Sequence, residues 1–119
     1  MTVSATIDVP CFLGKELYAH LTKDVEFPSL PSIGLSVAFK LKAIEQQREA
    51  ERYKALVKGC INSTGQVVIE SLTYYPQQNS EGKKLYVSAI PATANEEAEM
   101  TAYIKLMQEF YGFNVELCT

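Results

Sequence analysis

The single histidine and one of the three cysteines lie close together in the stretch VPCFLGKELYAHLTKD. A cysteine thiolate with a histidine base is a common nucleophilic pair, but the two side chains must approach to about 3 Å. Leucines recur at every fourth residue over Leu13–Leu21, which is typical of one helix face, so we expect a helix over residues 12–23. Along such a helix Cys11 and His20 would be ~13 Å apart. We therefore predict that they form no catalytic dyad.

A separate hypothesis is that Cys11 alone is a reactive thiolate, because it would lie directly before the N-terminus of that helix. The helix dipole lowers the pKa of a thiol there, and the thiolate is the reactive form. The alternative is that Cys11 is a small apolar residue filling the space between a strand and the helix. We favour the second interpretation. His20 follows Glu16 by four residues, so we expect a surface pair and no catalytic role for this histidine.

Other catalytic and cofactor chemistries lack their sequence signatures. One histidine cannot build a multi-histidine metal site. The chain contains neither the glycine-rich loops that bind nucleotide phosphates nor the serine motif of the strand-to-helix elbow in hydrolases. We predict no catalytic residue, no metal and no cofactor, and we do not expect an enzyme.

The composition fits one globular domain that spans residues 1–119. Hydrophobic residues make up 47% and charged residues 21%, as in ordinary soluble domains. No apolar run reaches the ~20 residues that span a bilayer, and the N-terminus lacks the basic and apolar regions of a secretory signal. Three widely spaced cysteines do not make a disulfide framework. We expect a cytoplasmic protein that does not bind membranes.

The hydrophobic patterns predict an α+β fold. A second helix is expected to end at Tyr111, with a capping box of Thr93 and Glu96 at its start and Gly112 as a left-handed stop. The expected order is β-α-β-β-β-β-α-β, with both helices packed on one face of a mostly antiparallel sheet. Two arrangements fit this order, a ferredoxin-like one with an extra hairpin and a sheet that wraps a helix. Strands are expected over residues 2–9, 33–43, 53–61, 66–76, 84–90 and 113–117.

Residues 42–58 fit two different structures. The period-two alternation that begins at Ile33 resumes at Tyr53, which favours a long hairpin. The same residues are good helix formers, and the segment ends in Lys58-Gly59, which resembles a helix stop. We favour the hairpin. Four lysines would then share one strand face, namely Lys40, Lys42, Lys54 and Lys58.

This lysine face and a surplus of tyrosine suggest a docking surface. Residues 40–58 carry six of the eleven basic residues, which would suit an acidic protein surface. A nucleic-acid partner is not expected, because no aromatic residues interleave with these lysines. The favoured interpretation is nevertheless a solvated sheet face that protects a strand edge. Three tyrosines are expected to face outward as interface residues: Tyr74, Tyr75 and Tyr86.

Three functional hypotheses follow. The leading one is a non-enzymatic protein-interaction module, an adaptor, inhibitor or assembly component that binds another protein or forms a homo-oligomer. The alternative is a protein that encloses an apolar ligand in a pocket lined by Phe27, Met100, Tyr103 and Met107. The third and weakest is a small enzyme that uses a Cys11 thiolate.

Overall fold

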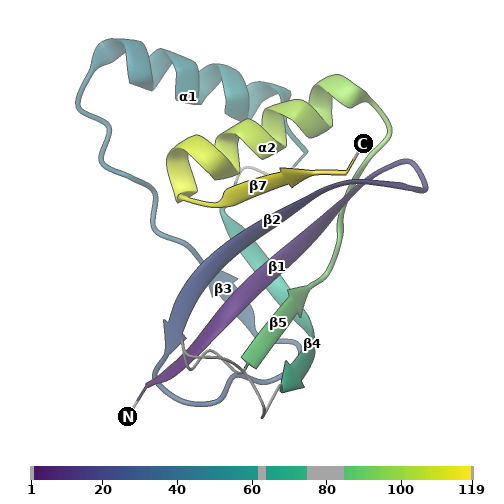
Figure 1. Cartoon of the computed structure of the whole chain (residues 1–119). Coiled ribbons are helices and arrows are strands. Elements are labelled where there is room, and N and C mark those ends of the chain that lie inside the picture. Colours follow the sequence, from purple (N-terminus) through teal and green to yellow (C-terminus); the bar gives the residue numbers. More distant parts are fainter. Residues whose placement is uncertain (1, 62–63, 75–84, 119) are drawn as a thin grey trace.

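A long N-terminal hairpin forms the centre of the sheet (Figure 1). The computed structural model describes residues 2–61, 64–74 and 85–118. Strands β1 (Val3–Leu13) and β2 (Glu16–Phe27) pair antiparallel over their whole length. Gly14 turns the chain between them with a φ of 64°, a backbone conformation that favours glycine. The helix expected over residues 12–23 is therefore wrong.

Seven strands make one mixed, mostly antiparallel sheet in the order β3-β4-β5-β1-β2-β7, with β6 also paired to β1. Only β5 and β6 run parallel to β1, and they pair with successive parts of it. Among the described strands, this order therefore ends at β3 and β7, and β6 pairs with β1 alone. The remaining strands are β3 (Ser36–Ala38), β4 (Gln66–Tyr74), β5 (Leu85–Ala89), β6 (Ala92–Ala94) and β7 (Asn114–Leu117).

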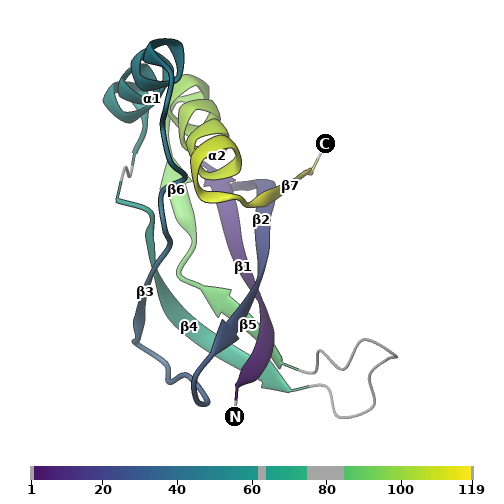
Figure 2. The ribbon, with the colours of Figure 1, turned by 90° about the vertical axis from the view of Figure 1, so that its left-hand side faces the viewer.

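Two helices lie together at one end of the sheet (Figures 1 and 2). Helix α2 (Glu97–Tyr111) packs on β1, β2, β6 and β7, whereas α1 (Gln47–Gly59) packs on α2 and buries none of its residues fully. The predicted α+β class, with a mostly antiparallel sheet and two helices, is confirmed. The hairpin favoured for residues 42–58 is wrong, because most of this segment is α1. Neither helix has the length and apolar character needed to cross a membrane.

The ends of α2 are fixed differently from one another. Gly112 adopts a φ of 77° and ends the helix, as predicted. The predicted capping box is wrong, because Thr93 belongs to β6 and Glu96 is the residue that precedes the helix, without a side-chain capping bond. At the C-terminal end, Lys23 of β2 donates a hydrogen bond from Nζ to the carbonyl of Tyr111 at 2.6 Å. This cation satisfies a carbonyl that the helix itself leaves open.

The core lies between the inner face of the sheet and α2. Every second residue of β1 from Ala5 to Cys11 is at most 1% exposed, and α2 contributes seven buried residues. The other face of the hairpin is polar, with Thr6 donating to Asp24 at 2.9 Å and Ser4 to Glu26 at 3.2 Å. One face of the hairpin therefore builds the core and the other is an open polar surface.

Candidate functional site

The outer edge of β7 is the clearest candidate for an interaction site. Among the described strands, β7 pairs with β2 alone. The Cys118 amide donates to the carbonyl of Tyr18 at 2.9 Å, so residue 118 faces β2. Hydrogen-bonding groups alternate sides along an antiparallel strand, and the amides and carbonyls of Val115 and Leu117 therefore point away from β2. An added strand would find these groups ready to pair.

A groove runs beside this edge, between β7 and α2. Its volume is about 370 Å³, and its apolar lining comes from Tyr18, Ile104, Val115 and Leu117. Lys105 is the one charged residue of the lining. Leu117 is 57% exposed, so it is available to a partner. The edge and the groove together offer backbone pairing and apolar contact to the same partner segment, and we call them the β7 site.

The sequence did not reveal this site, although it predicted its strand. The alternation in residues 113–117 indicated a last strand after α2. Its edge position depends on which strand it pairs with, and that information is not local. The helix expected over residues 12–23 also hid Tyr18, because that residue reaches the groove only as part of β2. An irregularity in the β1–β2 register, next to Cys11, accompanies this placement.

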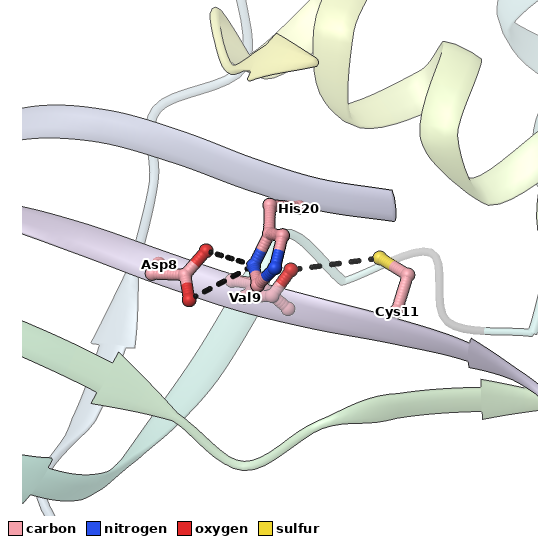
Figure 3. Close-up of polar contacts among 4 residues, drawn as sticks. All are labelled: Asp8, Val9, Cys11 and His20. Atoms are coloured by element: carbon pink, nitrogen blue, oxygen red, sulfur yellow. Dashed lines mark hydrogen bonds and ion pairs between the residues drawn. The ribbon is translucent and has the colours of Figure 1, made fainter. Parts of the chain in front are cut away.

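Asp8 and His20 form a second polar feature, on the open face of the hairpin (Figure 3). The His20 Nδ1 lies 3.0 Å from Oδ1 and 3.2 Å from Oδ2 of Asp8. The residue Asp8 is 5% exposed, and the His20 side chain is 32% exposed. Since a carboxylate only accepts hydrogen bonds, Nδ1 is the donor, which fixes the orientation of the ring. The sequence interpretation placed His20 beside Glu16 and missed Asp8, because it did not recognise the hairpin.

An oriented imidazole is half of a general-base arrangement, and the other half is a recess that holds a substrate beside it. Asp8 and His20 line none of the four principal hollows of the described surface. A general base must reach the proton it removes in a bound substrate. We therefore interpret the pair as a cross-strand contact that ties β1 to β2.

Cys11 is a core residue and not a reactive thiol at a helix N-terminus. It lies in β1, is 0% exposed, and its Sγ contacts the Val9 carbonyl at 3.6 Å. Burial, with a smaller contribution from Asp8, raises the pKa of the thiol to about 12. The hairpin places His20 opposite Pro10, on the strand next to Cys11, so their predicted separation along a helix is wrong. Cys11 pairs with Ala19, the neighbour of His20 in β2, so the Cys11 and His20 side chains lie on opposite faces of the hairpin.

The four lysines of the expected patch do not share a strand face. Lys40 and Lys42 lie in the irregular segment between β3 and α1, whereas Lys54 and Lys58 lie on α1. Lys42 forms an ion pair with Glu49 at 2.7 Å, and its Nζ lies 5.2 Å from the centre of the Phe110 ring. The single-face arrangement is thus wrong, because α1 replaces the second strand of the expected hairpin. A docking role for these lysines stays a prediction.

The tyrosines expected at the interface do not lie beside these lysines. Tyr74 is the last residue of β4 and is 62% exposed, at the end of the sheet away from α1 (Figure 1). Tyr86 is half-buried on β5, across from Thr73. Tyr75 lies outside the described residues. The structure therefore does not gather the lysines and tyrosines into one surface.

The residues expected to line a pocket are mainly packed in the core. Phe27 is 8% exposed, and Met100, Tyr103 and Met107 are at most 1% exposed. Of these four residues, Tyr103 alone lines one of the four principal hollows.

Comparison with known proteins adds no information on function. No family model, curated protein or solved structure matches this chain. Within residues 2–61, 64–74 and 85–118, no three histidine, cysteine, aspartate or glutamate side chains gather so that they could hold a metal ion. The function is therefore argued from the geometry of the chain itself.

Proposed function

We propose that this chain is a cytoplasmic protein-interaction module that acts as an assembly component. It binds a second copy of itself by pairing β7 with β7 across a two-fold axis. The observation that carries the proposal is the β7 site, where unpaired backbone groups lie next to an apolar groove. A cytoplasmic location is supported by the three cysteines, none of which forms a disulfide within the described residues.

Charge decides between the registers that such a pair could adopt. In an antiparallel β7–β7 pair, the core-facing sides of both copies can lie on the same face of the extended sheet. The two-fold axis then passes between one residue of β7 and the same residue of the second copy. An axis through Glu116 would set two carboxylates directly opposite one another, which destabilises a strand pair. An axis through Val115 sets Asn114 opposite Glu116 of the second copy, where the amide can donate to the carboxylate. We infer the Val115 register.

The helix that borders the groove suits the same symmetry. Four residues of α2 line the groove: Thr101, Ile104, Lys105 and Gln108. Their spacing is symmetric about its midpoint, so a two-fold axis that passed over this midpoint would set Thr101 opposite Gln108 and Ile104 opposite Lys105 of the second copy. The aliphatic stem of lysine packs well on an apolar side chain while the ammonium stays in water. Two-fold interfaces need self-complementarity of this kind.

Replacing Leu117 with lysine is expected to convert the dimer to a monomer. The substitution places a charge in the groove and a lysine on the pairing edge, and natural edge strands use lysine to prevent such pairing. We expect the dimer dissociation constant to rise at least about tenfold. The measurement is sedimentation equilibrium over a concentration series, alongside light scattering of the unaltered protein.

Ile33→Lys is the matched control, because Ile33 is 66% exposed, similar to the 57% of Leu117, and does not line the groove. This variant is expected to remain dimeric. An unaltered protein that is monomeric at high micromolar concentration would contradict the proposal. Equal weakening by the two lysine substitutions would also contradict it.

A cysteine placed at the two-fold axis is expected to cross-link the dimer. In the inferred register the two Val115 Cα atoms are about 5.5 Å apart, within the range that a disulfide spans. In a background with Cys60→Ser and Cys118→Ser, Val115→Cys should yield a covalent dimer on mild oxidation, seen by non-reducing electrophoresis.

Glu116→Cys is the control for the register. In the Val115 register the two residues 116 are diagonal neighbours about 7–8 Å apart, so they should cross-link far more slowly. Faster cross-linking at residue 116 would show the other register. No cross-linking at either position would contradict pairing through β7.

A further inference from the structure

A second hollow opens on the opposite side of α2 from the β7 site, between the start of β4 and the β5–β6 connection. Its volume is about 280 Å³. The exposed residues at its mouth are Gln66, Ile90 and Thr93, and the buried residues at its floor are Val9, Val67 and Tyr103. The hollow therefore leads from the surface into the core.

The floor of this hollow carries a polar group without a protein partner. No residue in the described part of the chain hydrogen-bonds to the Tyr103 hydroxyl, although the residue is only 1% exposed. Every fully buried side-chain nitrogen or oxygen of the described residues has a partner. The Tyr103 hydroxyl is therefore not fully enclosed, and Tyr103 lines the hollow, so water there can reach it. An apolar ligand that displaced this water would leave the hydroxyl without an acceptor, whereas a ligand that carries an acceptor would replace the lost hydrogen bond.

The lining restricts the chemistry of what can bind. It contains no lysine, arginine, histidine, aspartate or glutamate, so a charged ligand would lose its hydration without gaining a counter-charge. Burial raises the pKa of the Tyr103 hydroxyl, which consequently remains protonated and able to donate. A closed apolar cavity of about 150 Å³ is enough for benzene. The hollow is thus large enough for a benzene ring with a short substituent.

From these observations we infer a binding site for an uncharged small molecule, the size of a substituted benzene ring, whose oxygen accepts a hydrogen bond from Tyr103. The apolar body of the ligand lies against Val9, Val67 and their neighbours. The oxygen points inward, toward α2, and the rest of the molecule toward the mouth. This site is separate from the β7 site and does not depend on self-association.

Two probes with the same carbon skeleton test the inference. Acetophenone carries a carbonyl acceptor, and ethylbenzene has CH2 in place of the carbonyl. Titration of isotope-labelled protein, followed by amide NMR, should show acetophenone binding with shifts at Val9, Val67 and Tyr103. Its affinity should exceed that of ethylbenzene by about three- to tenfold, the range expected for one neutral hydrogen bond. Benzoate, which is charged, should not bind there.

Tyr103→Phe removes the hydroxyl and leaves the ring. It should abolish the preference for acetophenone and leave the affinity for ethylbenzene unchanged. Equal affinities of the unaltered protein for the two probes would overturn the inference, as would amide shifts confined to other parts of the surface. The comparison of acetophenone with ethylbenzene needs only the unaltered protein. It therefore tests the inference even if Tyr103→Phe does not fold.

Discussion

Replacing Gly65 with alanine is expected to destabilise the fold by about 2–5 kcal/mol, the sum of a backbone contribution and a steric contribution. Gly65 has a φ of +66°, which costs other residues roughly 1–2 kcal/mol. A Cβ at this position would lie 2.4 Å from Cε1 of the Tyr111 ring. Tyr111 is 5% exposed at the end of α2, so the ring has little room to retreat. Chemical denaturation followed by circular dichroism measures the loss.

Gly14→Ala separates the two contributions. Gly14 has a φ of +64°, almost the same as Gly65, but nothing lies within 4 Å of the added Cβ. This variant should lose only the backbone contribution, about 1–2 kcal/mol. The difference between the two variants measures the contact with the Tyr111 ring. Equal losses would mean that the ring moves aside at no cost, contrary to our expectation.

Replacing Phe110 with alanine is the second large effect, with an expected loss of about 3–5 kcal/mol. The ring is 2% exposed, and its centre lies 5.3 Å from that of Tyr53 in an edge-on arrangement. Lys42 contacts the same ring, and the Lys42 amide donates to the Phe110 carbonyl at 2.9 Å. Phe110 therefore joins α2 to α1 and to the segment that precedes α1. Denaturant titration gives the total loss.

Hydrogen exchange should show that this loss is concentrated in α1, because α1 has no fully buried residue of its own. Arg52 and Glu109 also join the two helices, with both hydrogen bonds at 2.6 Å. Exposed pairs of this kind contribute little, so they should not hold α1 in place. Phe110→Leu keeps most of the apolar volume and should cost less than about 1.5 kcal/mol. Unchanged exchange in α1 of the alanine variant would refute the linking role.

The C-terminal part of the fold could be predicted because its signals are local. The apolar residues from Met100 to Tyr111 recur at the spacing of a helix and fit no strand. Gly112 ends the helix through its own backbone conformation, which does not depend on tertiary packing. The residues expected on this apolar stripe are all buried, namely Met100, Tyr103, Ile104, Met107, Phe110 and Tyr111. Helix α2 also buries Leu106, which the stripe did not include. Here local pattern and tertiary packing agree.

The N-terminal hairpin could not be predicted from its leucines, because apolar residues at every fourth position fit both a helix and a strand. A spacing of four is close to one helical turn, but it is also an even number, so leucines at that spacing can lie along one face of a strand. Two signals distinguish these cases. Val25 and Phe27 continue the alternation beyond the expected helix, and Gly14-Lys15 is a suitable two-residue hairpin turn. The glycine that would weaken a helix is the residue that the hairpin needs.

Residues 42–58 illustrate the opposite error. The alternation from Ile33 to Ala43 is real, but its regular strand β3 is short, Ser36–Ala38, with further backbone hydrogen bonds to β4 from Gly34 and Leu35. The helix formers that follow became α1, whose Tyr53 and Val57 pack on the core from outside. The apolar stripe of α1 is narrow because this helix packs on α2 and not on the sheet, so it needs fewer buried residues.

The pairing of β1 has a consequence for how the chain folds. Ala5 pairs with Leu85, and Cys11 with Ala92, so one edge of β1 stays unpaired until residues some 80 positions later in the chain are synthesised. At a synthesis rate of about 5–20 residues per second, this edge stays unpaired for several seconds on the ribosome. Contacts so distant in sequence also slow folding, since the intervening loop must close first. The nascent hairpin therefore exposes an unpaired strand edge, which other chains can pair with, and we expect aggregation to begin at this stage.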